Sequence, residues 1–323
     1  MDRHIDRLMF SGSRRSLAGR WFAVGLLVAT ASSPALAQRE KEIPEPRDVE
    51  LTTKDGVRLA ATYFGSDRER EAGALILLHM FKGSRADYEG LARLLQREHH
   101  FAVLTLDLRG HGESIHQSFG EEQRTLSPER LRHEDFEAMV QYDVEEAKRF
   151  LIRENNSGQL NIERLGLVGA EMGATIAAYW TFNDWAAPRL TVKQGQDVKA
   201  LVLISPETRF KAFSIVEPFT SPEMRSEVAL YLIAGAGSSR ATKGVDQIQS
   251  AVKRYHPEPA AGLPADKALA EKTLFVDTGY ATSLQGTKML GEQLGVEERI
   301  ARFFELRLVK PSIPWAERRS AVP

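Results

Sequence analysis

The stretch at residues 165–174, LGLVGAEMGA, is the part of the sequence that best indicates the fold. Its first four residues form a short apolar run that predicts a strand, and a helical pattern follows at 174–185. Gly169 and Gly173 flank the connection, where the absence of a side chain lets the backbones of a strand and a helix approach closely. The stretch therefore predicts a tight strand-to-helix turn with Glu171 inside it.

Apolar runs and helical patterns alternate on both sides of this turn. Further strands are expected at 49–52, 57–63, 74–79, 101–107, 200–204, 229–234 and 273–276. Further helices are expected at 88–98, 134–153 and 289–304. The first two strands are joined around Asp55 and Gly56, a strong hairpin signal. A hairpin followed by repeated strand–helix units predicts an α/β protein with a mostly parallel central sheet and helices on both faces.

Two segments between the expected elements indicate which insertions the domain carries. The polar stretch at 115–133 is expected to be a loop-like insertion. Only about two dozen residues separate the strand that ends at Ile204 from the one that starts at Ala229, so we expect no large helical lid.

Composition excludes several kinds of chemistry. The 323 residues include no Cys, which rules out disulfides, zinc–thiolate sites, iron–sulfur clusters and a cysteine nucleophile. With 43 Lys and Arg against 44 Asp and Glu, the net charge of −1 provides no electrostatic footprint for nucleic acid. The 42% hydrophobic and 27% charged residues are typical of a globular protein. We expect no cofactor and no metal.

The first 37 residues resemble a secretory signal peptide. Five arginines against two aspartates give residues 1–20 a charge of +3, a short apolar core follows at 21–30, and Ala35 and Ala37 provide the small residues of a cleavage site. The apolar core is well short of the ~20 residues that a membrane span needs. We therefore expect cleavage after Ala37, no stable membrane span afterwards, and a periplasmic or secreted protein.

The remaining chain is expected to form one domain. Residues 38–47 are polar and contain prolines, as in a linker, and residues 48–306 carry the α/β pattern. Residues 307–323 are expected to form an irregular C-terminal tail.

Five segments resemble, in order, those that carry the active site in the α/β-hydrolase superfamily, and the resemblance covers about 49–304. They are Leu77–Gly83 (oxyanion loop), Leu106–Ser114 (a D-x-R-G-x-G-x-S loop), Leu167–Ala174 (nucleophile elbow), Ile233–Ser239 (acid-bearing loop) and Gln285–Thr287 (histidine-bearing loop). Small carboxylesterases, dienelactone hydrolases and lysophospholipase-like members are the most similar type. The resemblance implies an α/β-hydrolase fold with its pocket at the carboxyl ends of the strands.

The residues that such an active site needs are absent from the matching positions. The resemblance implies a nucleophilic Ser at 171, an acid at 238 or 239 and a His at 285, but the chain has Glu171, Ser239 and Gln285. The elbow frame of Gly169 and Gly173 is kept, as are His79, Met80 and Phe81 of the oxyanion-loop region. The sequence therefore predicts an exported, catalytically inactive protein that binds a small-molecule ligand or an envelope protein.

Two alternatives stay open. Glu171 could serve an active ester hydrolase as a non-standard base or nucleophile, with His79 or Asp277 nearby. The chain could also be an envelope scaffold that uses the insertion at 115–133 as an interaction surface. We expect His79 and His111 to be structural.

Two charged residues of the D-x-R-G-x-G-x-S loop are expected to be structural. Asp107 and Arg109 are expected to organise this loop through hydrogen bonds and an ion pair.

Overall fold

The computed structural model describes residues 42–291 and 293–319. Within them the strands are β1 (Arg47–Thr52), β2 (Val57–Phe64), β3 (Gly73–Leu78), β4 (Ala102–Leu106), β5 (His116–Phe119), β6 (Glu122–Thr125), β7 (Asn161–Ala170), β8 (Val198–Ile204), β9 (Arg209–Phe210), β10 (Phe213–Ser214), β11 (Ala229–Gly235) and β12 (Leu274–Tyr280). The helices are α1 (Glu89–Arg97), α2 (His133–Ala138), α3 (Val144–Asn156), α4 (Met172–Ala186), α5 (Pro222–Ser226), α6 (Ser239–Val252), α7 (Ala265–Glu271) and α8 (Val296–Phe304). The signal peptide expected at 1–37 and the first part of the expected linker, residues 38–41, lie outside the described residues.

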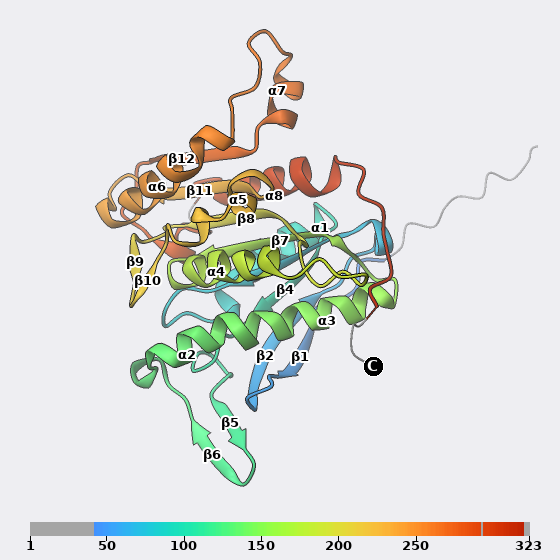
Figure 1. The fold of residues 1–323 in the computed structure, drawn as a ribbon, viewed down its shortest axis with the longest axis vertical. Coiled ribbons are helices and arrows are strands. Elements are labelled where there is room, and N and C mark those ends of the chain that lie inside the picture. Colours follow the sequence, from blue (N-terminus) through green and yellow to red (C-terminus); the bar gives the residue numbers. More distant parts are fainter. Residues whose placement is uncertain (1–41, 292, 320–323) are drawn as a thin grey trace, which may run out of the picture. The chain divides into compact units, whose positions relative to one another are not determined.

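A ten-stranded sheet forms the centre of the domain, in the order β12-β11-β8-β7-β3-β4-β2-β5-β6, with β1 paired to β2 (Figure 1). The strands from β12 to β4 run parallel, and β2 joins them antiparallel through Ala61 opposite Leu106. The N-terminal strands β1 and β2 form the expected hairpin. The prediction of a mostly parallel sheet that begins with a hairpin is therefore confirmed.

The sheet is buried because alternate residues of its central strands pack into two separate hydrophobic cores. In β3, Ala74, Ile76 and Leu78 belong to one core, and Leu75 and Leu77 belong to the other. Such continuous apolar runs are what parallel strands need when helices cover both faces.

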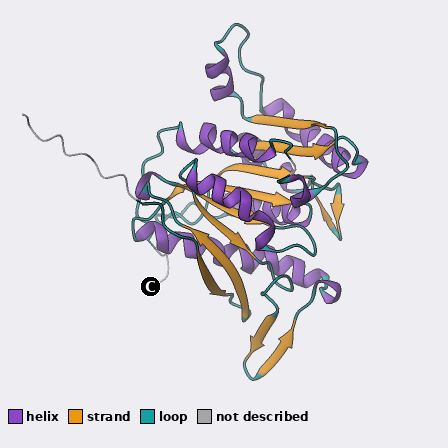
Figure 2. Ribbon diagram, turned by 180° about the vertical axis from the view of Figure 1, so that it is seen from behind, coloured by secondary structure: helices purple, strands orange, loops and turns teal. Residues whose placement is uncertain are grey.

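Helices cover both faces of the sheet, as the sequence predicts (Figure 2). Buried residues of α3, α4 and α6 pack into the first core, and those of α1 and α8 pack into the second. The long helix expected at 134–153 is α2 and α3, joined by a π-helical turn at Met139–Asp143. Only small elements, β9, β10 and α5, lie between β8 and β11, so the prediction that no large lid is present is also confirmed.

The stretch at 115–133 is not the loop that the sequence predicts. It contains a β-hairpin, β5 and β6, that extends the sheet through two residue pairs between β5 and β2. The hairpin was missed because most of its residues are exposed on both faces, so no apolar alternation marks the strands.

The C-terminal residues 310–319 contain no helix or strand, yet they are anchored to the domain. Asn155 and Asn161 donate side-chain hydrogen bonds to the carbonyl oxygens of Ala316 and Ile313, at 3.0 and 3.1 Å. Arg318 is buried and forms a bidentate ion pair with the side chain of Asp197. In the part of the chain that the structure describes, no helix has the length and apolar character to cross a membrane.

Candidate functional site

Glu171 lies on a strained turn between β7 and α4, where the sequence predicts the strand-to-helix turn. Its backbone φ is +47°, a conformation that residues with a side chain rarely adopt. Hydrogen bonds hold the turn: the Glu171 N–H donates to the carbonyl of Ile204 at 3.0 Å, and its carbonyl accepts from the N–H of Ala174 at 3.1 Å. Such strain persists only where surrounding contacts fix the backbone, and it is common at functional sites.

The two glycines of the frame allow this turn to form. A Cβ on Gly169 would overlap the carbonyl of Gly173, and a Cβ on Gly173 would overlap the carbonyl of Leu78. Both positions therefore require glycine because backbones approach them closely, which is the reason the sequence suggested.

The carboxylate of Glu171 is half-buried and carries no hydrogen bond from any residue that the structure describes. Burial raises its pKa above the ordinary value, and the nearby charge of Glu207 raises it further. Lys288 and Arg240 oppose this shift through their positive charges. The carboxylate is thus placed among mixed charges, with free lone pairs available to a ligand.

The loop after β12 lies directly beside this carboxylate. Gly286 has φ of +57°, and a Cβ on it would lie 3.3 Å from Cγ of Glu171 and 2.9 Å from Sδ of Met80. The neighbouring Gln285 is partly exposed, and its side chain makes no hydrogen bond within residues 42–291 and 293–319. The structure therefore brings the elbow, the oxyanion-loop region and the loop at 285–287 together.

Ser205 holds this loop in place, although no pattern in the sequence marks it as a site residue. It follows β8, has φ of +50° and is fully buried. Its hydroxyl accepts a hydrogen bond from the N–H of Gly286 at 2.9 Å and lies 3.5 Å from Sδ of Met289. The one signal available in the sequence was its place directly after a buried strand, at the edge of the sheet where the elbow lies.

Ser238 and Ser239 begin α6 after β11. Ser238 is buried and caps the helix, accepting a hydrogen bond from the N–H of Ala241 at 3.3 Å. Ser239 is exposed, and no hydrogen bond within the described ranges connects it to Glu171 or Gln285. The structure therefore places Glu171 beside the loop that carries Gln285. It shows no hydrogen bond between Ser239 and either of these residues within the described ranges.

His79 is held by backbone contacts at both ring nitrogens. It is fully buried, Nδ1 lies 2.7 Å from the carbonyl of Met80, and the N–H of Leu108 donates to Nε2 at 3.1 Å. This arrangement assigns the proton to Nδ1. Burial lowers the pKa of His79. Both ring nitrogens are occupied, so His79 has none free to act on Glu171.

Phe81 and His111 extend the oxyanion-loop region. Their rings lie 5.6 Å apart, and Phe81 lies 6.1 Å from Phe210. His111 is buried next to His79, and its Nδ1 lies 3.1 Å from the carbonyl of Arg109. Burial lowers the pKa of His111 to about 4, so the ring is neutral at pH 7.

Asp107 and Arg109 organise their loop, but each has a different ionic partner. Asp107 is paired with Arg85 and accepts a hydrogen bond from the N–H of Glu113 at 3.0 Å.

The Arg109 guanidinium contacts Asp55 and Asp143, both at 2.6 Å. Asp277, the other group considered near Glu171, is paired instead with Arg299.

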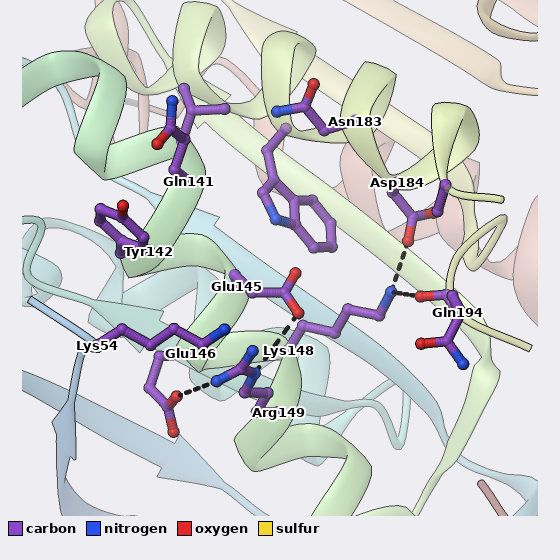
Figure 3. A pocket seen from close by; sticks show the side chains of 13 residues that line it. Lys54, Gln141, Tyr142, Glu145, Glu146, Lys148, Arg149, Asn183, Asp184 and Gln194 are labelled. Carbon is purple, nitrogen blue, oxygen red and sulfur yellow. Dashed lines mark hydrogen bonds and ion pairs between the residues drawn. The ribbon is translucent and has the colours of Figure 1, made fainter. Parts of the chain in front are cut away.

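A cavity of about 360 Å³ lies away from the elbow, between α3 and α4 (Figure 3). Its wall includes Lys148, whose Nζ lies 2.7 Å from Asp184, and Glu145 beside Arg149. Glu171 is not among its lining residues. Within the described ranges no group of three or more His, Asp or Glu side chains is placed to hold a metal ion.

Comparisons with known proteins agree with this architecture. A family model described as "Serine aminopeptidase, S33" matches residues 69–263. An esterase from Pyrococcus furiosus has a TM-score of 0.55 at 15% identity, covering 82% of this chain and 93% of its own. A carboxyl esterase from Bacillus coagulans has a TM-score of 0.55 at 12% identity, covering 82% of this chain and 100% of its own.

A third solved structure, a dienelactone hydrolase from Anabaena variabilis, has a TM-score of 0.51 at 15% identity, covering 83% of this chain and 100% of its own. No curated protein matches the chain. At these identities the solved structures establish the fold alone, and that fold is the α/β-hydrolase fold that the sequence predicts.

Proposed function

The chain belongs to the family described as "Serine aminopeptidase, S33" within the α/β-hydrolase superfamily, and we propose that it is a member that has lost catalysis and acts by binding. In this proposal Glu171, Ser239 and Gln285 replace the nucleophile, the acid and the base. The bound partner is a small-molecule ligand or an envelope protein.

The observation that carries the proposal is the unpartnered carboxylate of Glu171 on a turn with φ of +47°. Ester hydrolysis passes through an oxyanion, which the active site must stabilise with hydrogen-bond donors. A negative charge at the elbow repels that oxyanion. The N-terminus of α4 favours an anion by ~0.3–1 kcal/mol, so the carboxylate fits the fold while opposing the chemistry.

Neither of the two residues considered as a base for the elbow, His79 and Gln285, is available for that role in the described part of the chain, which supports the same conclusion. A hydroxyl or water needs a proton acceptor within hydrogen-bond reach. His79 has both nitrogens occupied by Met80 and Leu108. The position after β12 holds Gln285, whose amide does not titrate.

A second candidate is an active ester hydrolase that uses Glu171 as general base. The raised pKa of Glu171 favours it, because a base works best when its pKa lies near the operating pH. Under this candidate the rate falls as the pH drops through the pKa of Glu171, and Glu171→Gln removes the activity. Against it stand the separate pairing of Asp277 with Arg299 and the lack, among the residues that the structure describes, of a hydrogen-bond partner that orients Glu171.

Hydrolysis of short p-nitrophenyl esters by the purified protein separates the two candidates. The proposal expects the same rate for the protein and for its Glu171→Ala variant, both equal to the buffer. Hydrolysis that is present in the protein and lost in Glu171→Ala would show that the second candidate is correct.

The export of the protein is part of the proposal and rests on the sequence of residues 1–37. Sequencing the N-terminus of the protein from a cell envelope or medium fraction tests it. We expect Gln38 as the first residue; an intact Met1 in a cytoplasmic fraction alone would contradict export.

A further inference from the structure

The two outermost strands of the central sheet, β6 and β12, lie at opposite edges. Figure 1 shows the β5–β6 hairpin at one end of the domain and β12 with α7 at the other. Each of these strands pairs on one side only among the strands that the structure describes. Open edges are places where a second chain can dock.

The tip of the β5–β6 hairpin carries an apolar side chain in water. Phe119 is 73% exposed, the largest exposed fraction among the large apolar residues that the structure describes. Glu121 and Glu122 follow it, are exposed, and form no ion pair within residues 42–291 and 293–319. The tip therefore presents an aromatic ring next to unpaired negative charge.

An apolar groove lies at the opposite edge of the sheet, between β12, α7 and α8. It encloses about 400 Å³, and its apolar wall includes Leu269, Phe275, Phe303 and Leu306. Leu269 is 40% exposed at its mouth. A groove of this size and composition is suited to an inserted aromatic side chain.

The rim of the groove is more basic than acidic. Lys272, Arg299 and Arg302 line it together with Asp277 and Glu298.

Each of these basic groups already has an acidic partner at the surface: Lys272 pairs with Glu258, Arg299 with Asp277 and Arg302 with Glu305. Pairs of this kind contribute little stability and can exchange partners. The rim can therefore receive the charge of an acidic segment.

We propose that the β5–β6 tip of one copy of this chain docks into the groove of a second copy. Phe119 enters the groove, and Glu121 and Glu122 face its basic rim. Because the two surfaces lie at opposite edges of one sheet, they cannot meet within a molecule, and the contact is head-to-tail. Such a contact joins copies into a ring or an open chain.

The charges of the edge strands favour insertion of Phe119 into the groove over direct pairing of β6 with β12. β6 has the sequence EQRT with all four residues exposed, and β12 carries Asp277 near its middle. Charged residues on edge strands oppose strand-to-strand association. This inference does not depend on whether the elbow is catalytic.

Sedimentation velocity over a concentration series tests the association. We expect the weight-average mass of the purified protein to rise with concentration, and to stay at the monomer value for Phe119→Ser and for Leu269→Glu. Leu190→Ser is the matched control, because Leu190 is 59% exposed and lies outside both surfaces. A protein that remains monomeric at every concentration, or a Leu190→Ser variant as defective as Phe119→Ser, would overturn the proposal.

Mixing the two defective variants tests whether the contact is head-to-tail, with the tip of one copy in the groove of the other. Phe119→Ser keeps an intact groove and Leu269→Glu keeps an intact tip, so the mixture is expected to form a two-copy complex and nothing larger. A mixture that stays monomeric contradicts a head-to-tail contact.

Cross-linking tests the contact itself. The chain has no cysteine, so Ser118→Cys and Ala270→Cys introduce single reactive thiols at exposed positions beside Phe119 and Leu269, which both stay in place. A short bis-maleimide should join the two variants to each other more efficiently than it joins either variant to Leu190→Cys. Equal yields in all three mixtures would contradict the proposed contact.

Discussion

The side chain of Glu171 lies so close to Gly286 that a Cβ at position 286 would crowd it. A Cβ on Gly286 would lie 3.3 Å from Cγ of Glu171 and 2.9 Å from the sulfur of Met80. This contact joins the strand-to-helix turn to the loop after β12. It is the structural basis for treating both as one site.

Replacing Gly286 with alanine should disturb this contact and destabilise the fold. The left-handed φ of +57° costs a residue with a Cβ about 1–2 kcal/mol, and crowding against Met80 adds to that cost. Urea unfolding measures the change. Gly262→Ala is the control, because Gly262 has φ of +88° with open space around it and should show the backbone cost alone. Equal losses in the two variants would mean that the contact at Gly286 is not tight.

Removing the hydroxyl of Ser205 should also loosen the loop. Ser205→Ala leaves the buried N–H of Gly286 without its acceptor, and such a loss costs ~1–3 kcal/mol. Denaturant unfolding measures it against Ser239→Ala, which removes an exposed hydroxyl and should change stability by no more than about 0.5 kcal/mol. A neutral Ser205→Ala would show that the hydrogen bond to Gly286 is dispensable.

The contrast between Ser205 and the elbow shows which features a sequence can reveal. The elbow was predicted because its glycines form a local pattern: Gly169 and Gly173 flank one short strand-to-helix turn, although the backbone that crowds Gly173 belongs to Leu78 in another strand. The function of Ser205 depends on contact with a residue 81 positions away, which no local pattern records.

The other elements and contacts also differ in how clearly the sequence indicates them. Apolar runs predicted the buried strands, because burial on both faces leaves a clear signal. The exposed β5–β6 hairpin leaves no such signal. The partners of Arg109 and the buried ion pair of Arg318 with Asp197 join distant segments, so the chain has to fold before they can be seen.

The stability of the protein should fall in mildly acidic solution, partly through His111. Burial lowers the pKa of His111 from 6.5 to about 4, so the folded state favours the neutral ring. Below pH 6.5 the unfolded chain therefore binds the proton more readily, and the free energy of unfolding decreases as the pH drops from about 6.5 toward about 4. The loss due to this residue is on the order of 3 kcal/mol.

The variant His111→Asn isolates this contribution, because an amide nitrogen can still donate to the carbonyl of Arg109. We expect its free energy of unfolding to depend less on pH between about 4 and 6.5. Ser118→Asn, which exchanges one exposed side chain that does not titrate for another, should keep the pH dependence of the original protein. An unchanged slope in His111→Asn would show that His111 is not the group responsible.

Ester hydrolysis by the variant Glu171→Ser shows whether the elbow has a working base. This variant restores a nucleophile type to the turn while Ser239 and Gln285 stay as they are. If no base serves the elbow, Glu171→Ser should hydrolyse p-nitrophenyl acetate no faster than the buffer does. Measurable hydrolysis is expected only when Gln285→His, which places a base on the loop beside the elbow, is added to that variant. Hydrolysis by the Glu171→Ser variant alone would contradict the account, because it would mean that a base other than residue 285 already serves the elbow.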